Sequence, residues 1–305
     1  MKGQASKVEV QTVKSLKEAL GALSKAATSG QPWRLLAGAT DVGVLHNSGH
    51  LPDGFLLNIW SLRKELGFIR KNKSQIEIGA LTTFAEISEN KDLIKVFPNL
   101  TAAARQVGAI QIQNRATIGG NIANASPAGD SLPALLSYDA VIKIKSSSGE
   151  RLVPLTQFFL GYKKLDLKSD EMIVSVILPM AAKGTQHFYR KVGTRQAQAI
   201  SKVVMATTKV PASFPEAGKG PGHSGYQFQI SLGAVGPVPL RCTHVENFLN
   251  AHPVPKRETE SWYEWLDRAA ALLDQDISPR DDIRSSREYR STVSKNLLKE
   301  FLKCR

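Results

Sequence analysis

Apolar residues recur at helical spacing near the N-terminus of the chain. Leu16, Leu20 and Leu23 follow one another at intervals of four and three, and Gly30 is a typical helix stop. Ser15, with Glu18 three positions later, has the spacing of a capping box. Short apolar runs, which predict buried strands, then alternate with small helices. We expect strands at residues 33–37, 55–59, 76–79, 141–145 and 173–178, and helices after Thr83 and at residues 100–107. Thr83 and Glu86 have the spacing of a capping box for the first of these helices.

The second half of the chain has longer apolar runs and ends in helical patterns. Residues 201–210 and 226–235 predict two strands, and residues 211–225, rich in proline, glycine and serine, predict a long hairpin loop between them. Thr243 and Glu246 repeat the spacing of a capping box. Strands followed by terminal helices favour an α+β class. The helices are expected at residues 260–273 and 288–302, the latter with Tyr289, Val293, Leu297 and Phe301 on one face.

Length and composition indicate a globular protein of about two domains. The chain has 305 residues, of which 42% are hydrophobic and 22% are charged, close to globular averages. Pro179 closes an apolar run and marks a domain boundary in residues 179–184. We expect a first domain over residues 1–179, with subdomains at about 1–58 and 59–179, and a second over 180–305.

The chain is basic, with a formal net charge of +13 from 40 Lys and Arg and 27 Asp and Glu residues. Such an excess raises the question of nucleic acid binding. The cations are dispersed, however, with no run of five and no stripe of interleaved aromatic residues. This pattern favours a solvated basic surface over an acidic protein partner, and both over nucleic acid, so no nucleic acid partner is expected.

Cysteine usage limits the redox chemistry that this chain can perform alone. Cys242 and Cys304 are its only cysteines, whereas an iron–sulfur cluster needs about four thiolates. The six histidines are scattered without metal-ligand spacing, so no metal site is expected. The first ten residues lack the apolar core of a signal peptide, and no apolar run approaches the roughly 18 residues of a membrane helix. We therefore expect a cytoplasmic protein without a membrane span.

The segment from Thr117 to Asp130, with the sequence TIGGNIANASPAGD, contains the strongest candidate chemistry. It combines a Gly-Gly step with small polar residues and has no charge before its final carboxylate. Glycines allow a backbone to approach a ligand closely, and free amides in such a loop form an anion site suited to a pyrophosphate. Asp130 would then accept a hydrogen bond from a sugar hydroxyl. The alternative is a tight loop that merely connects core elements.

An earlier glycine segment along the chain, Gly38-Ala39-Thr40-Asp41-Val42-Gly43, follows a predicted strand, and we call it the first glycine segment and Thr117–Asp130 the second. It lacks the glycine pattern of a Rossmann unit, and Val44-Leu45 stands where a P-loop needs Lys-Ser/Thr, which argues against NTP hydrolysis. Two loops that converge from different parts of a domain would bind a pyrophosphate without lysines, unlike the helix N-terminus of a Rossmann unit. The residues therefore predict a dinucleotide or similar diphosphate between two glycine loops.

The chain resembles, over nearly its whole length, the flavin-binding medium subunits of molybdenum hydroxylases. This family includes the carbon monoxide dehydrogenase type and the central domain of xanthine dehydrogenases. The resemblance rests on motifs that occur in order, namely LAGATDV at 36–42, QIQNRATIGGN at 111–121, Ala125-Ser126-Pro127 and Asp130, FLGY at 159–162, EMI at 171–173, YRKV at 189–192 before Arg195, SLGAV at 231–235 and REYR at 287–290.

The resemblance implies an α+β fold, with a two-part FAD-binding domain of the vanillyl-alcohol oxidase (PCMH) type and a C-terminal domain like that of the carbon monoxide dehydrogenase flavoprotein. It implies an oxidoreductase subunit with non-covalent FAD, a small [2Fe–2S] partner and a large molybdenum-cofactor partner. No catalytic side chain is expected, because the flavin itself carries the electrons. The cofactor-binding residues implied or expected are Leu35, Leu36, Ala37, Gly38, Ala39, Thr40, Asp41, Val42, Val107, Ile110, Thr117, Ile118, Gly119, Gly120, Asn121, Ser126, Asp130, Ile173 and Lys191.

Several of these residues have a structural alternative. By resemblance Asp130 lies near the adenosine half of FAD, but it would otherwise cap a helix that starts near Ser131. Asp41 would equally serve as a helix N-cap. Lys191 would lie near the pyrimidine end of the flavin or form a surface ion pair. Thr117, Asn121 and Ser126 would bind phosphate or ribose, or else satisfy the backbone of their own loop.

Two residues depart from the family pattern, and three further candidates precede the segment Thr117–Asp130. Val107 stands where relatives carry an aromatic residue, and Ala39 stands where many have a second glycine, so its methyl group should restrict φ. Ile110, Gln111 and Gln113 are expected near the isoalloxazine ring. Tyr162 and Tyr189 are expected in the core.

Three functions compete at this point. The first is an electron-transfer subunit that passes electrons from partner clusters through FAD to an external acceptor, and the lack of cysteines supports it. The second is a free-standing flavin oxidase or dehydrogenase of a small molecule, for which no catalytic base can be named. The third is a non-enzymatic basic binding module, for example one for RNA. Neither the substrate nor the acceptor can be derived from the sequence.

Overall fold

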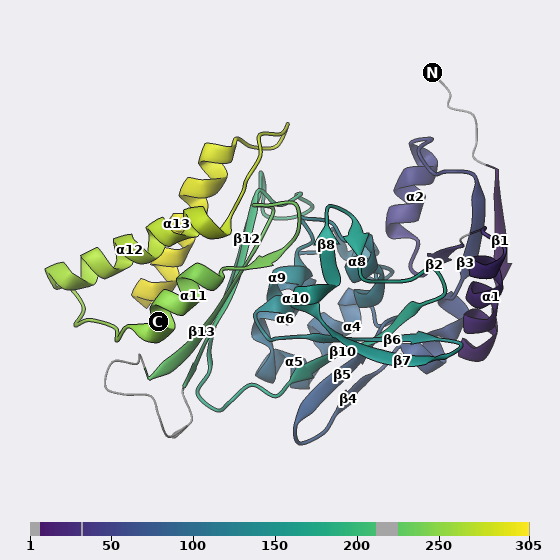
Figure 1. Ribbon diagram of the computed structural model, residues 1–305, viewed down its shortest axis with the longest axis horizontal. Coiled ribbons are helices and arrows are strands. Elements are labelled where there is room, and N and C mark those ends of the chain that lie inside the picture. The colour runs from purple at the N-terminus through teal and green to yellow at the C-terminus, as the bar shows by residue number, and fades with distance from the viewer. Residues whose placement is uncertain (1–6, 32, 212–224, 305) are drawn as a thin grey trace.

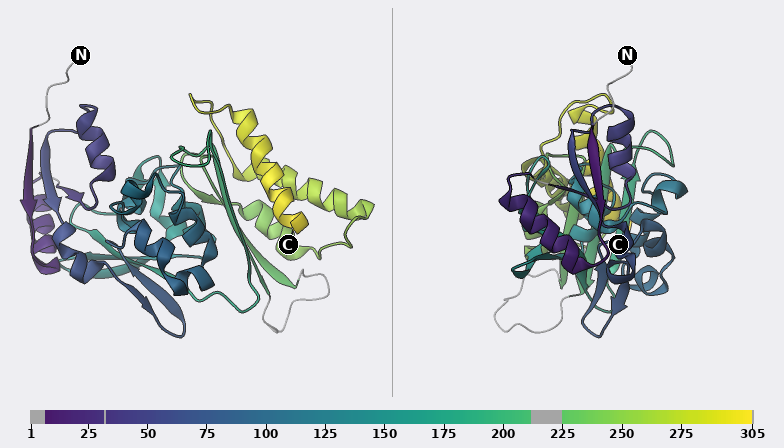
Figure 2. Two further views of the ribbon diagram at one scale, coloured as in Figure 1. Left: turned by 180° about the vertical axis from the view of Figure 1, so that it is seen from behind. Right: turned by 90° about the vertical axis from the view of Figure 1, so that its right-hand side faces the viewer.

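The protein is described here by a computed structural model, which covers residues 7–31, 33–211 and 225–304. Three β-sheets succeed one another along the long axis of the molecule, and the helices pack between and beyond them (Figure 1). The order follows the sequence, with the N-terminal sheet at one end and the last three helices at the other (Figures 1 and 2). The hairpin loop expected at residues 211–225 lies almost entirely outside the described residues.

The N-terminal sheet is parallel, with strand order β1-β3-β2. Strand β2 is followed directly by the turn at Gly38 and by helix α2, so that the first glycine segment is a turn and a helix start rather than an open loop. The elements of this part are β1 (Val8–Thr12), α1 (Leu16–Thr28), β2 (Arg34–Leu36), α2 (Thr40–Asn47), β3 (Gly54–Asn58), the 3₁₀ turn η1 (Trp60–Leu62) and α3 (Arg63–Leu66).

The middle sheet is antiparallel in the pairs that its registers define, with strand order β4-β5-β10-β6-β7. A series of short helices connects β5 to β6. The strands are β4 (Ile69–Lys71), β5 (Gln75–Gly79), β6 (Val141–Ser146), β7 (Gly149–Pro154), the separate hairpin β8 (Phe159–Gly161) and β9 (Lys164–Leu165), and β10 (Met172–Pro179). The helices are α4 (Phe84–Glu89), α5 (Lys91–Val96), α6 (Pro98–Ala104), α7 (Ile110–Gln113), α8 (Ile118–Asn124), α9 (Ser131–Leu136) and α10 (Leu155–Phe158).

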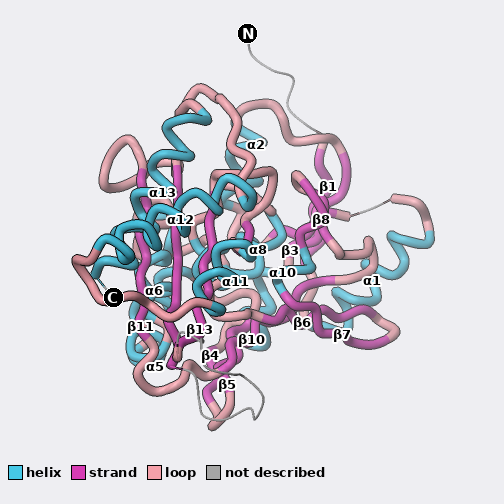
Figure 3. Tube along the Cα trace, turned by 60° about the vertical axis from the view of Figure 1, so that its left-hand side comes forward, coloured by secondary structure: helices cyan, strands magenta, loops and turns pink. Residues whose placement is uncertain are grey.

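The C-terminal sheet is antiparallel with order β11-β12-β13-β14 and is covered on both faces. Helices α6 and α9 of the preceding part pack against it on one side, and the last helices pack against it on the other (Figure 1). In Figure 3 these last helices lie in front of the sheet. Its elements are β11 (Gln186–Val192), β12 (Val203–Pro211), β13 (Tyr226–Gly233), β14 (Leu240–Arg241), α11 (Thr243–Ala251), α12 (Glu260–Asp276) and α13 (Arg287–Cys304). The α+β class expected from the sequence is confirmed.

The apolar residues form three buried clusters that follow the three sheets. The middle cluster also includes Ala206 of β12, so the C-terminal sheet completes the core of the preceding domain. On α13, Leu297 and Phe301 are buried as expected, whereas Tyr289 is exposed at the start of the helix. Tyr189 packs against the middle cluster, but the expectation that Tyr162 is a core residue is wrong, because it is 67% exposed on the β8–β9 turn.

The three predicted capping boxes differ in outcome. Thr83 and Glu86 form a complete box on α4. On α1, Ser15 accepts from the Glu18 amide, but the Glu18 carboxylate accepts from the Lys14 amide instead of the Ser15 amide, so the box is incomplete.

The box predicted for α11 is wrong. Glu246 is buried and accepts hydrogen bonds from the Ile230 amide and from Arg241. The amides of His244 and Val245 are capped by the Asp276 carboxylate from the end of α12, at 3.0 and 3.2 Å. The spacing of two residues could not reveal these partners from other elements.

Candidate functional site

The first glycine turn joins β2 to α2. Ala39 precedes the helix with φ of 65° and ψ of 7°, a left-handed conformation that costs an L-residue about 1–2 kcal/mol. The expected restriction of φ by its methyl group therefore does not prevent the turn. Asp41 is not the N-cap of α2, because Ala39 occupies that position. The described residues provide no hydrogen-bond acceptor for the amides of Thr40 and Val42, so these donors at the positive end of α2 are available to a ligand.

The second glycine segment is the N-terminus of α8 and not an open loop. Thr117 is the N-cap, and its Oγ1 accepts from the Gly120 amide at 3.1 Å. The amides of Ile118 and Gly119 donate to the carbonyls of Thr82 and Ala80, at 3.0 and 2.9 Å. These three amides are thus engaged with the protein, which corrects the expectation of free amides in this segment.

The two glycine segments contact one another. A side chain at Gly38 would place its Cβ 1.8 Å from the carbonyl oxygen of Arg115, two residues before the cap of α8. The Asn124 amide on α8 donates to the Asp41 carboxylate on α2 at 3.0 Å. The convergence that the sequence analysis required for a pyrophosphate site is therefore present, because the start of α2 lies against the segment that leads into α8.

Each glycine has a different role in this arrangement. Gly38 permits the approach of the two segments, and Gly119 permits the approach of α8 to Ala80, whose Cβ would lie 2.7 Å from an added Cβ. Gly120 is exposed, and an added Cβ there would meet only Thr117 Oγ1, at 2.9 Å. Gly120 is consequently the glycine whose Cα faces the space in front of the helix.

Asn124 was not among the candidate residues from the sequence, although it joins α8 to α2. It lies four residues after Gly120 and thus on the same face of α8. A helical interpretation of the segment would have placed the two residues together. The other polar candidates have partners within the protein, since Ser126 Oγ accepts from the Ala128 amide and Asn121 Oδ1 accepts from Ser131.

Asp130, just before α9, and Lys191 on β11 form a buried ion pair. Lys191 Nζ on β11 lies 2.7 Å from Asp130 Oδ2, and the side chains are 6% and 11% exposed. The same ammonium donates to the carbonyl of Gln106 at 2.8 Å. The hydroxyl of Ser201 donates to Asp130 Oδ1, and that of Tyr189 donates to the Asp130 carbonyl. The structural alternatives from the sequence, a helix cap for Asp130 and a surface ion pair for Lys191, are both wrong. Asp130 caps no helix with its side chain, and Lys191 is not at the surface.

Burial and pairing act on the Asp130 carboxyl in opposite directions. Removal from water raises its pKa above the usual value, while Lys191 and the Ser201 hydroxyl oppose that rise. Burial also raises the pKa of the Tyr189 phenol, and the negative charge of Asp130 raises it further. The phenol is therefore a neutral donor, and the only cation in direct contact with this carboxylate among the described residues is Lys191.

The ion pair corrects the expected placement of its two members. Asp130 was expected near the adenosine half of FAD and Lys191 near the flavin, which are opposite ends of an extended dinucleotide. A separation of 2.7 Å puts both charged groups at one place.

The apolar candidates lie in two environments. Val107 and Ile173 are buried in the middle core, where an aromatic residue at Val107 would need additional space. Ile110 is 57% exposed on α7, available to an apolar ligand or protein surface. Gln113 is buried and donates to the Arg105 carbonyl at 3.0 Å, so its amide group supports the turn before α7. Leu35, Leu36 and Ala37 form the end of β2 and the following turn, with half-buried side chains.

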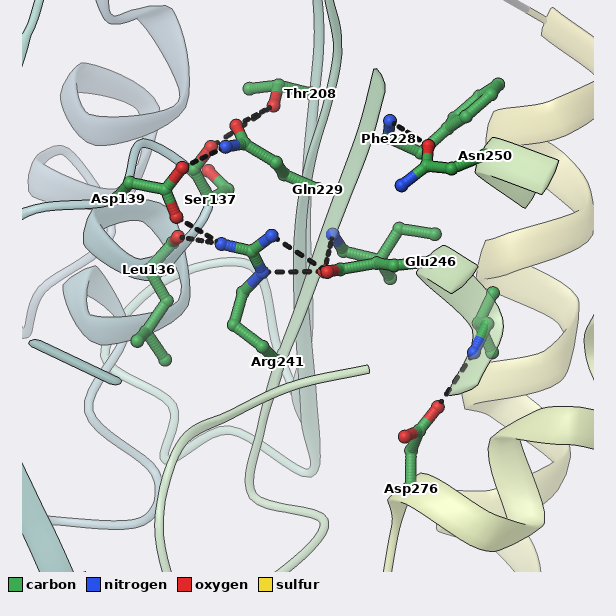
Figure 4. Close-up of polar contacts among 12 residues, drawn as sticks. Leu136, Ser137, Asp139, Thr208, Phe228, Gln229, Arg241, Glu246, Asn250 and Asp276 are labelled. Carbon is green, nitrogen blue, oxygen red and sulfur yellow. Dashed lines mark hydrogen bonds and ion pairs between the residues drawn. The ribbon is translucent and has the colours of Figure 1, made fainter. Parts of the chain in front are cut away.

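A second polar cluster joins the same two domains at the other end of α9 (Figure 4). Arg241 on β14 pairs with Glu246 through two hydrogen bonds, 2.6 and 2.8 Å long. It also donates to the Asp139 carboxylate and to the Leu136 carbonyl. Gln229 links Asp139 to Thr208. Burial raises the pKa of Glu246 and Arg241 opposes that rise. Since the guanidinium is almost fully used, this cluster connects elements and offers little to a ligand.

Metal binding and membrane insertion find no support in the described residues. No group of three or more His, Cys, Asp and Glu side chains is arranged to bind a metal ion. Within the same part of the chain, no helix combines the length and apolar character needed to cross a bilayer. Cys242 is buried, and burial raises the pKa of its thiol well above the usual value, so it is a weak nucleophile.

Two family models account for nearly all of the chain. Residues 6–181 match the FAD binding domain in molybdopterin dehydrogenase. Residues 188–304 match the CO dehydrogenase flavoprotein C-terminal domain.

Individual proteins agree with these matches. The chain is 32% identical over 277 residues to the xanthine dehydrogenase FAD-binding subunit of Escherichia coli O157:H7, covering 88% of this chain and 87% of that one. It is 35% identical over 193 residues to the nicotinate dehydrogenase FAD-subunit of Eubacterium barkeri, covering 62% and 64%. Among solved structures it resembles a chain of carbon monoxide dehydrogenase from Hydrogenophaga pseudoflava, with a TM-score of 0.84, 25% identity and coverage of 97% and 96%.

Proposed function

The chain belongs to the FAD-binding medium subunits of the xanthine and carbon monoxide dehydrogenase family, and we propose that it passes electrons through one non-covalent FAD within a molybdenum hydroxylase complex. Electrons would come from [2Fe–2S] clusters on a small partner, after substrate oxidation at a molybdenum cofactor on a large partner. They would leave to an external acceptor. The family resemblance noted from the sequence is confirmed, and the chain is an oxidoreductase subunit.

The observation that supports this proposal most strongly is the meeting of the two glycine segments. The start of α2 has free amides, and the Asn124–Asp41 hydrogen bond joins α2 to α8, the helix that carries the exposed Gly120. A pyrophosphate fits such a place because backbone donors and helix N-termini favour anions. The Asp41 carboxylate would repel the phosphates, but it is turned toward Asn124, so we assign binding to the Asp41 amide.

FAD supplies the redox chemistry when bound, and the protein supplies binding and orientation. In this proposal the amides of Thr40, Asp41 and Val42 and the Nδ2 group of Asn121 bind the pyrophosphate. Gly120, whose own amide donates to Thr117, leaves room for the phosphates beside α8. Gly119 contributes only the close approach of α8 to Ala80, because its amide is already used. The Asp130 carboxylate, to which Lys191 donates, accepts a hydrogen bond from an N–H or O–H group of the cofactor.

The heteromeric assignment rests on two observations. The chain has only two cysteines, too few for the roughly four thiolates of a cluster. The similar chains are described as an FAD-binding subunit, an FAD-subunit and a medium chain, which names them as parts of larger enzymes. The partners of this chain and its cytoplasmic location remain part of the proposal.

The proposal is tested by purifying the native complex through a tag on this chain and measuring its FAD, iron and molybdenum. We expect all three in the wild-type complex. Gly120→Val should remove FAD but leave iron and molybdenum, because the branched side chain occupies the space in front of α8. Gly21→Val is the matched control, since Gly21 lies on α1 and an added Cβ there meets nothing within 4 Å.

Two results would contradict the proposal. Retention of FAD in a folded Gly120→Val complex would refute the assignment of the pyrophosphate site. A chain that purifies alone with FAD and oxidises a small molecule unaided would instead support a free-standing flavin oxidase or dehydrogenase.

A further inference from the structure

We infer that Ser201 is a positioning residue for the cofactor site, through a hydrogen bond that orients the Asp130 carboxylate from the other domain. This inference rests on the proposed function, in which Asp130 contacts FAD. Ser201 lies outside every motif that identified the cofactor-binding residues in the sequence. Its place just before β12 brings it to the seam between the two domains.

The contacts of Asp130 leave its side chain little freedom. Ser201 Oγ donates to Oδ1 at 2.5 Å, and Lys191 Nζ donates to Oδ2 at 2.7 Å. One donor therefore binds each carboxylate oxygen, so rotation of the carboxylate plane would break both hydrogen bonds. The Tyr189 hydroxyl fixes the main chain of Asp130 at 3.2 Å. Lys191 is itself held by the Gln106 carbonyl at 2.8 Å.

The backbone places Ser201 firmly. Ser201 is fully buried, and the amide of the next residue, Lys202, donates to the carbonyl of Val192 at 2.8 Å. That bond closes the base of the β11–β12 connection, so Ser201, just before β12, is held close to Lys191 of β11. The hydroxyl is thus a buried donor that its backbone holds in place, and not a mobile surface group.

The hydrogen bond leaves Asp130 able to act on a ligand. An ionised carboxylate has about four acceptor positions, and Ser201 and Lys191 occupy two of them. The remaining positions point in directions set by these two donors. A donor group of the cofactor would then meet an acceptor that is already oriented, which lowers the entropic cost of binding.

Loss of the hydroxyl should also change how Asp130 titrates. The charged and titratable groups that face this carboxyl are Lys191 and Tyr189 on β11, and neither is altered by a change at Ser201. The Ser201 hydrogen bond lowers the pKa of Asp130 against the effect of burial. Without it the pKa rises, so the carboxylate is neutralised at a higher pH on acidification. A merely structural serine would not produce this shift.

The experiment compares FAD affinity of the Ser201→Ala and wild-type chains between pH 5 and pH 8, by flavin fluorescence. We expect affinity to fall about 10- to 100-fold near neutral pH, as for loss of one hydrogen bond to a charged group, and the acid limb of the profile to move to higher pH. Ser201→Thr, which keeps the hydroxyl, should restore both. Ser294→Ala is the control, because Ser294 is equally buried but donates to the Arg290 carbonyl on α13.

A double-mutant cycle makes the interpretation specific. In an Asp130→Asn background, Ser201→Ala should cause no further loss. If Ser201→Ala does not fold, Ser201→Cys takes its place in every measurement. Equal affinity and an unchanged pH profile in the folded variant would overturn the inference, as would an equal loss in the Asp130→Asn background. A wild-type chain that binds no FAD, alone or in its complex, would instead overturn the proposed function.

Discussion

Helix α9 has an acidic residue at each end, and the two ends differ in what they leave free. Asp130 precedes the helix and pairs with Lys191 of β11, while Asp139 follows it and pairs with Arg241 of β14. Strands β11 and β14 are the two edges of the same sheet. The C-terminal domain therefore holds α9 by one ion pair at each edge of its sheet.

The surroundings of the two pairs decide their roles. Both partners of the Asp130 pair are buried, and the carboxylate, at the end of the segment Thr117–Asp130, retains acceptor positions. At the other end the Asp139 side chain is 52% exposed, and Arg241 spends its remaining donors on Glu246 and Leu136. Both pairs join one end of α9 to an edge strand of the same sheet, but this shared placement does not give them the same function. We assign the first pair to cofactor binding and the second to fixing the domains.

The largest expected effect is that of Lys191→Met. It leaves the buried Asp130 carboxylate without a cation, which should lower the free energy of unfolding by about 3–5 kcal/mol and weaken FAD binding as well. Arg190→Met is the control, because the neighbouring Arg190–Glu300 pair is exposed and contributes at most about 1 kcal/mol. Urea unfolding and FAD titration measure the two effects. Equal stability losses in the two variants would remove the distinction between a buried and an exposed pair.

Arg241→Met should separate stability from cofactor binding. It leaves the buried Glu246 carboxylate unpaired, and we expect a loss of about 3 kcal/mol in the free energy of unfolding. FAD affinity of the folded variant should stay within about twofold, since no cofactor contact is assigned to this end of α9. The same urea and FAD titrations apply. A large drop in affinity would show that the two ends of α9 are coupled and that their roles are not separate.

Asn124→Ala should have the opposite profile to Arg241→Met. It removes the hydrogen bond between α8 and α2 at a half-exposed position, which should cost about 1 kcal/mol of stability or less. Because the bond joins the two segments of the pyrophosphate site, FAD affinity should fall about fivefold. Fluorescence titration of the variant, with Asn47→Ala at the far end of α2 as the control, measures this. Unchanged affinity would mean that the two segments need no link between α8 and α2.

The smallest effect is expected for Ala39→Gly. Glycine removes the cost of the left-handed conformation but increases the entropy of the unfolded chain, so the net gain in stability should be under about 1 kcal/mol. FAD affinity and both ends of α9 should be unaffected. Thermal unfolding is the appropriate measurement. A clear loss of stability would indicate that the methyl group makes contacts that offset the strain.

The sequence predicted local features and family better than contacts between distant residues. Thr83 and Glu86 formed the expected capping box because both partners lie in one helix turn. The same spacing at Thr243 failed, since Glu246 is bound by Arg241 and Ile230. Likewise, the Asp130–Lys191 pair joins residues 61 positions apart, and no local pattern reports such a contact.

The glycine segments show the same limit within the site. Their sequences predicted a close backbone approach, and the structure provides it at Gly38 and Gly119, although the close neighbours are Arg115 and Ala80 of the protein itself. A glycine that fits against another backbone and a glycine that faces a ligand look alike in a sequence. Only the arrangement in space distinguishes Gly120 from the others.

The most direct test of FAD binding by this chain is a titration of the deflavinated chain with FAD, followed by desalting and a visible absorption spectrum. If the two glycine segments form one FAD site, we expect one FAD per chain, with flavin bands and no iron–sulfur absorbance. A folded chain that retains no FAD, both alone and in its native complex, would contradict the claim that the two glycine segments form a single FAD site.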